Sequence, residues 1–93
     1  MEQNTDTEFR PLAREDLLCR DLDDEAIVYD ATTSKVHALN ATARLIWSTC
    51  DGKHTLEDLA KALLDRFDVD QDTARRDAQR TIEEFRTLGL LED

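Results

Sequence analysis

The segment SKVHALNATARLIW, residues 34–47, predicts a strand that leads directly into a helix. Polar and apolar side chains alternate from Lys35 to Leu39, which is typical of a strand with one buried face. Asn40 is a favourable N-cap, because its side-chain oxygen can accept a hydrogen bond from an unpaired amide of the first helical turn. The apolar residues around it recur at helical spacing and predict one apolar helix face: Leu39, Ala43, Ile46, Trp47 and Cys50.

Two more strands are predicted before this segment. The stretch DLLCRDL, residues 16–22, would place Leu18 and Leu22 on the same face of a strand. The stretch AIVYD, residues 26–30, is rich in β-branched and aromatic residues, which favour a pleated, half-buried surface. Because short polar connections join the three strands, the sequence predicts an antiparallel meander.

Two more helices are predicted after it. Gly52 ends the first helix, since glycine readily adopts the left-handed conformation there. Thr55 begins the second helix, with Asp58 three positions later as an approximate capping box. The third helix begins within residues 68–72, where acidic residues favour a helix N-terminus, and it ends at Gly89. Three strands followed by three helices predict an α+β fold, with a three-stranded antiparallel sheet that offers one face to the helices.

The chain length of 93 residues fits one small domain. Residues 1–14 show no hydrophobic periodicity, so we expect a flexible N-terminal arm followed by a domain over residues 15–93. No apolar run approaches the roughly 20 residues that a membrane span needs. The acidic, polar N-terminus also lacks the basic and apolar regions of a secretion signal. These features predict a cytoplasmic protein without a membrane partner.

The net charge of -10 argues against a nucleic-acid partner, because phosphate binding depends on clustered lysines and arginines. A small sheet with two helices joined by a short turn would nevertheless fit a winged-helix DNA-binding or regulatory domain. The predicted third helix carries four arginines, but many of them have acids three or four positions away, so ion pairs on a solvated face explain them as well: Arg75, Arg76, Arg80 and Arg86.

No residue pattern indicates an enzyme, a cofactor or a metal site. Neither His37 nor His54 has a nucleophile at a recognised spacing. Cys50 and His54 are four positions apart, as metal ligands can be, but a zinc site needs three or four ligands and Cys19 is the only other thiol. In a chain without an export signal, the two cysteines are expected to be reduced. A non-catalytic role is therefore predicted.

The most useful feature that remains is the edge of the predicted sheet. A sheet edge offers unpaired amides and carbonyls, to which an extended peptide can add itself as another strand. On a helical wheel, the apolar stripe of the third helix has Arg75, Gln79 and Arg86 on one side and Asp77 and Glu84 on the other. If the basic side faced such a peptide, acidic peptide side chains would be favoured. A purely structural subunit of a larger enzyme is a third interpretation, after peptide binding and DNA binding.

Three stretches of the sequence resemble the PqqD-like proteins, small peptide chaperones of pyrroloquinoline quinone biosynthesis. These stretches are EAIVYDATTSKVHALNATARLIWSTCDG, TLEDLAKALLDRFDVD and ARRDAQRTIEEFRTLGLL, and the resemblance covers about residues 15–91. It implies a winged-helix-like domain that recognises the leader of a ribosomally made precursor peptide and presents the peptide to a modifying enzyme, such as a radical-SAM protein. The leader would add as a strand to the edge of the third strand, beside the third helix. The peptide-binding positions that it implies are Lys35, Val36, His37 and Ala38 on the strand and Arg75, Ala78, Gln79 and Ile82 on the helix.

Overall fold

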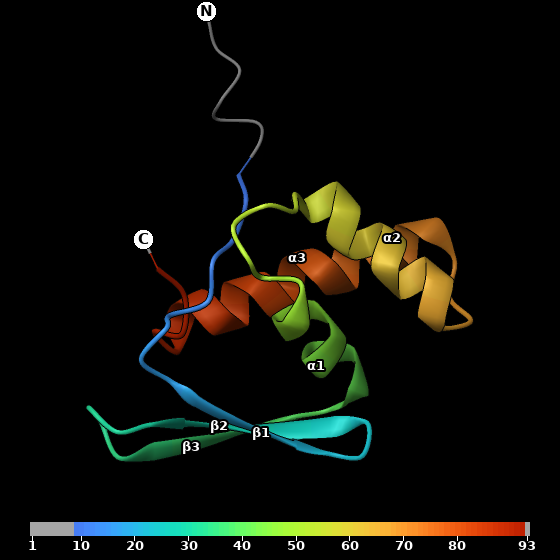
Figure 1. Ribbon diagram of the computed structural model, residues 1–93. Helices are drawn as coiled ribbons and strands as arrows, with labels where there is room; N and C mark the ends of the chain where they lie inside the picture. Colours follow the sequence, from blue (N-terminus) through green and yellow to red (C-terminus); the bar gives the residue numbers. More distant parts are fainter. Residues whose placement is uncertain (1–8, 93) are drawn as a thin grey trace, which may run out of the picture.

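A computed structural model describes residues 9–92 of the chain, which form three strands followed by three helices (Figure 1). The strands are β1 (Leu18–Leu22), β2 (Glu25–Asp30) and β3 (Lys35–Leu39), and they form one antiparallel sheet in the order β1-β2-β3. The helices are α1 (Ala41–Ser48), α2 (Leu56–Arg66) and α3 (Gln71–Thr87). All three helices lie on one side of the sheet (Figure 1). The predicted α+β fold is therefore confirmed.

The register of the sheet assigns its side chains to two faces. Val28 pairs with Cys19 of β1 and with His37 of β3, and its side chain is fully buried under the helices. Its neighbours Ile27 and Tyr29 are only half-buried, because alternate side chains of a strand point to the opposite face. The sheet thus has an inner face, which packs on the helices, and an outer face, which no described element covers.

Each helix begins at the capping residue that the sequence predicts or implies. The side chain of Asn40 accepts a hydrogen bond of 2.9 Å from the amide of Ala43 at the start of α1. Thr55 and Asp58 form a complete capping box at the start of α2. Asp70 caps α3 in the same way, by accepting a bond of 2.7 Å from the amide of Thr73. The strand-to-helix junction at residues 39–41 is consequently fixed by local chemistry.

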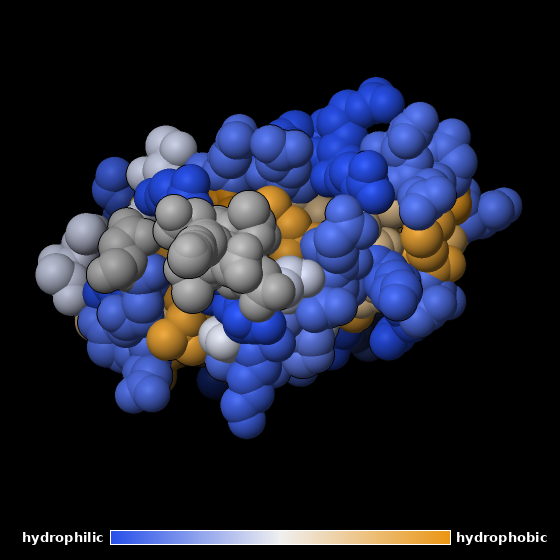
Figure 2. All heavy atoms as spheres, turned by 90° about the horizontal axis from the view of Figure 1, so that it is seen from above, coloured by the Kyte–Doolittle hydropathy of each residue, from blue (hydrophilic) through white to orange (hydrophobic). Residues whose placement is uncertain are grey.

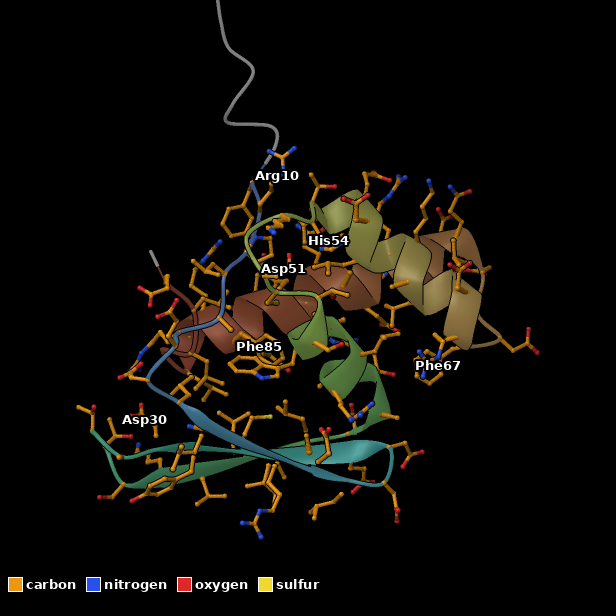
Figure 3. The ribbon with its side chains drawn as sticks, viewed as in Figure 1. Arg10, Asp30, Asp51, His54, Phe67 and Phe85 are labelled. Carbon is orange, nitrogen blue, oxygen red and sulfur yellow. The ribbon has the colours of Figure 1, made fainter. Side chains whose placement is uncertain are left out.

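The core lies between the inner face of the sheet and the helices. Phe85 of α3 is 2% exposed, and Figure 3 shows it between the helices and the sheet. Its ring meets Trp47 of α1 edge to face, with the ring centroids 5.3 Å apart. The buried apolar residues come from the sheet, from every helix and from the C-terminal tail: Ala26, Val28, Leu39, Ile46, Cys50, Leu59, Ala60, Leu63, Ala74, Ala78, Ile82, Phe85, Leu90 and Leu91.

The expected flexible arm is wrong for residues 9–14, which pack against the domain; residues 1–8 lie outside the described residues. Leu12 and Ala13 form isolated β-bridges with Asp51 and Leu91, and Pro11 is buried. The segment runs between the α1–α2 connection and the C-terminal tail. Its hydrogen bonds there are mostly between backbone groups, which any sequence can supply, so hydrophobic periodicity gave no sign of them.

Arg14 joins this segment to the sheet and to the C-terminal tail. Its guanidinium donates to the carboxylate of Asp30 at 3.2 Å and to the carbonyl of Gly89 at 2.8 Å. Asp30, at the end of β2, is 2% exposed, and burial alone would raise the pKa of its carboxyl group. The amides of Thr32 and Thr33 and the charge of Arg14 outweigh that cost and hold the pKa of Asp30 below its ordinary value. The carboxylate is therefore ionised at neutral pH and holds Arg14, which in turn bonds to the C-terminal tail.

Candidate functional site

The strand β3 forms one edge of the sheet, and no segment within residues 9–92 pairs with its outer side. Lys35, Val36 and Ala38 are exposed, and Val36 keeps 60% of its surface in contact with solvent. His37 is half-buried because it lies on the inner face, opposite Val28. The predicted strand residues thus lie along an open edge, as a peptide-adding strand requires.

The register indicates which backbone groups of β3 are available. A two-residue turn at Asp23 and Asp24 joins β1 to β2, and residues that flank such a turn form a hydrogen-bonded pair. Alternation from this pair directs the backbone groups of Ile27 and Tyr29 toward β1, and those of Val28 toward β3.

The same alternation decides the groups of β3. His37, opposite Val28, turns its amide and carbonyl toward β2. The amides and carbonyls of Val36 and Ala38 then face the open edge. Two residues of β3 therefore offer donors and acceptors to a further strand.

A hollow adjoins the end of β3, between the start of α1 and the side of α3. Its volume is about 310 Å³. A second hollow of about 520 Å³ continues along α3 and shares Arg80 and Glu84 with the first. The first is lined by Asn40, Thr42, Ala43, Asp77, Arg80, Thr81 and Glu84, and the second by Arg80, Glu83, Glu84, Thr87 and Leu88. A peptide that leaves the edge of β3 toward α3 would meet these residues.

The charge of the two hollows is negative. Asp77, Glu83 and Glu84 supply three carboxylates, and Arg80 is the one basic residue that lines either hollow. Arg80 already donates to Asp77 at 3.1 Å. An incoming cation would therefore be favoured over an anion.

The four predicted α3 residues are not brought together beside β3. Ala78 and Ile82 are 1% and 2% exposed, so they belong to the core and offer no surface to a ligand. Arg75 faces α2, where its guanidinium lies 3.2 Å from a carboxylate oxygen of Glu57. Gln79 is exposed, but it lines neither hollow. The side of α3 that faces the hollows is the acidic side of the helical wheel.

The basic side of α3 is occupied by contacts within the molecule. Arg75 pairs with Glu57, and the guanidinium of Arg86 lies over the ring of Phe9, 5.0 Å from its centroid. The sequence could show that α3 has a basic and an acidic side. It could not show which side faces β3, because that depends on how α1 and α2 pack against α3.

Neither cysteine forms a disulfide, and one of the two histidines, His54, pairs with an aspartate. Both cysteines are free thiols; Cys19 is exposed and Cys50 is buried, and burial with the nearby Asp51 raises the pKa of Cys50 to about 12. The Nδ1 atom of His54 lies 2.9 Å from a carboxylate oxygen of Asp51, and Figure 3 shows both in the α1–α2 connection. Residues 9–92 contain no group of three or more His, Cys, Asp or Glu side chains placed to hold a metal ion.

The helices of the described chain are also too short or too polar to cross a membrane. The surface opposite the sheet, seen from above in Figure 2, is covered mostly by hydrophilic side chains.

Comparison with known proteins gives a family and a fold. One similar structure is that of TbiB1 in complex with the TbiA(beta) leader peptide, with a TM-score of 0.78 and 23% identity, covering 87% of this chain and 94% of that chain. Another is a lasso peptide synthetase B1 complexed with the leader peptide, with a TM-score of 0.76 and 24% identity, covering 92% of this chain and 99% of that chain. No curated protein matches the chain. The model of the family described as "Coenzyme PQQ synthesis protein D (PqqD)" matches residues 25–91, and the chain therefore belongs to the PqqD family.

Proposed function

We propose that this chain is a non-catalytic adaptor that captures the leader of a precursor peptide and presents the peptide to a modifying enzyme. The observation that carries the proposal is the open edge of β3 next to the hollows along α3. Membership of the PqqD family and the likeness to two proteins solved with leader peptides support it. The adaptor would act in the cytoplasm, where precursor peptides are made. A radical-SAM protein is one enzyme class that it would serve.

Capture would occur by strand addition. A guest segment beside β3 would exchange main-chain hydrogen bonds with Val36 and Ala38, whose backbone groups face outward in the register described above. Main-chain bonds supply affinity with little dependence on sequence. Selectivity would come from guest side chains that reach the hollows between α1 and α3.

The charge of the hollows predicts the kind of leader. Because carboxylates of Asp77, Glu83 and Glu84 outnumber the single Arg80, we propose that the leader places a Lys or Arg side chain there. This reverses the preference for acidic peptides considered from the sequence alone, which required the basic side of α3 to face the peptide. In the folded chain, the acidic side of α3 lines the hollows.

The test is an NMR titration of the ¹⁵N-labelled chain with synthetic leader segments of the short precursors encoded beside its gene. Amide shifts are expected at residues 35–40 and 77–88, on β3 and the side of α3 that faces the hollows. The matched control is β1, the other edge of the sheet, where the amide resonances of residues 18–22 should not shift. Shifts confined to β1, or none with any such leader, would refute the proposal.

A second titration tests the charge preference. Replacing the Lys or Arg residues of a bound leader by Glu should weaken binding most strongly at low ionic strength, because the carboxylates of the hollows are solvent-accessible and screened by salt. An equal or tighter affinity would contradict the assignment of the acidic side of α3 to the site. The DNA-binding alternative has no support from the comparisons, and three of the four arginines of α3, Arg75, Arg80 and Arg86, have partners within the chain.

A further inference from the structure

The outer face of the sheet is largely apolar although no described element covers it. The register places Leu18, Ile27, Tyr29 and Val36 on this face together with Arg20 and Ala38, and Leu22 extends it toward the β1–β2 turn. An antiparallel sheet with one solvated face normally carries polar side chains there. Figure 1 shows the helices on the other side of the sheet, so they cannot cover these residues.

Exposed apolar surface is concentrated on this face. The described chain has five large hydrophobic residues that are classed as exposed, and three of them lie here: Leu18 at 65%, Leu22 at 46% and Val36 at 60%. The face is hollowed as well, by a depression of about 350 Å³. Its lining is mostly apolar and comes from Leu18, Cys19, Arg20, Ile27 and Tyr29. A clustered apolar patch of this kind on a small domain indicates a protein interface.

The charges around the patch select the kind of partner. At its Leu22 end the patch is bordered by the acids Asp23 and Glu25, and the register puts Glu25 on the outer face beside Leu22, while Arg20 is the one basic strand residue on this face. Neither Asp23 nor Glu25 forms an ion pair among the interactions of the described residues, whereas Asp24 lines a hollow on the helical side with Ala41 and Arg66. A second copy of the chain would bring another net charge of -10 against this face, which disfavours self-association. A partner with basic side chains around an apolar centre fits both features.

The chain's own N-terminal segment is not the occupant that the described residues favour. Phe9, the first described residue, lies under Arg86 of α3 and therefore enters the domain on the helical side of the sheet. The outer face is on the opposite side (Figure 1).

We propose that the outer face of the sheet is the docking surface for a second protein, with an apolar patch bordered by lysines or arginines. This inference rests on the proposed function, and the partner that it names is the peptide-modifying enzyme. The hollows along α3 lie on the helical side of the sheet, so docking would leave them open to a leader. The adaptor would hold peptide and enzyme at once on two different surfaces.

The experiment measures two affinities for each variant. One probe is the modifying enzyme encoded beside the gene of this chain, and the other is a synthetic leader of the adjacent precursor. Isothermal titration calorimetry measures the affinity of each variant for both. The variant Leu18→Ser/Leu22→Ser removes apolar surface from β1 without touching β3. It should weaken enzyme binding tenfold or more, as loss of central apolar contacts at an interface does, and leave the leader affinity unchanged. The matched control, Leu88→Ser, removes an equally exposed leucine that lines a hollow of α3 and should leave enzyme binding unchanged.

A charge variant keeps the proposal testable if the double serine variant fails to fold. Glu25→Lys, beside Leu22 on the outer face, should weaken enzyme binding several-fold at low salt, with the difference reduced at high salt. Unchanged enzyme affinity in both folded variants would overturn the docking surface while leaving leader capture intact. A wild-type dimer that Leu18→Ser/Leu22→Ser converts to a monomer in light scattering would overturn it too, because a second copy would then be the occupant.

Discussion

The substitution Ala38→Pro tests strand addition at the atom where it is proposed. Ala38 lies on an edge strand and its amide faces the open side, so a proline there removes no bond within the sheet and the fold should persist. A carbonyl of the guest strand, however, would lose the amide of residue 38 as its hydrogen-bond donor and stay without a partner. A lost bond of this type costs about 1–2 kcal/mol, and the rise in Kd for a leader peptide is therefore about 5- to 30-fold.

Fluorescence anisotropy of a labelled leader would measure this change against two controls. Ala38→Val retains the amide and should bind as the wild type does. Cys19→Pro removes an outward amide from β1, the opposite edge, and should also leave the affinity unchanged. Thermal melts establish that each variant is folded. If folded Ala38→Pro binds with wild-type affinity, the register or the edge is wrong; if Cys19→Pro weakens binding instead, the leader adds to β1.

The remaining predictions concern stability and reactivity. Phe85→Ala should lower the free energy of unfolding by about 3–5 kcal/mol, because the ring is buried against Trp47, and a loss below about 1 kcal/mol in urea titration would contradict that packing. The pKa of Asp30 lies below its ordinary 3.8, so its carboxylate stabilises the fold above about pH 4 and this contribution is lost as the pH falls through the lower folded value. Asp30→Asn should accordingly lower the melting temperature at pH 7 and make the acid-induced decrease shallower, whereas parallel pH profiles of the two proteins would argue against an ionised Asp30. Iodoacetamide at pH 8 should modify exposed Cys19 well before Cys50, whose pKa is raised to about 12, and peptide mass spectrometry that found equal rates in the native protein would count against the burial of Cys50.

The order and type of the elements could be predicted because local interactions determine them. Alternation in residues 26–30 and 35–39 marks strands, and each helix begins at a residue whose side chain accepts a bond from the amide three positions later. Gly89, with a φ angle of 76°, follows the C-cap of α3, so this predicted helix end rests on a local backbone preference. The predicted end at Gly52 is wrong for α1, which ends at Ser48 with Thr49 as its C-cap. The strand half of the candidate site, Lys35 to Ala38, could be predicted for the same reason, since the third strand of a three-stranded meander lies at an edge of the sheet.

Tertiary packing decided the other half of the site. Helical periodicity identified both flanks of α3, but only the packing of α1 and α2 turned Asp77 and Glu84 toward the hollows and Arg75 toward Glu57. The packing of residues 9–14 could not be predicted from the sequence either, because backbone hydrogen bonds to distant segments require no particular side chain. The sequence by itself determined which elements form and where they begin. The folded structure alone determined which of their faces meet, because that choice depends on contacts between residues far apart in the chain.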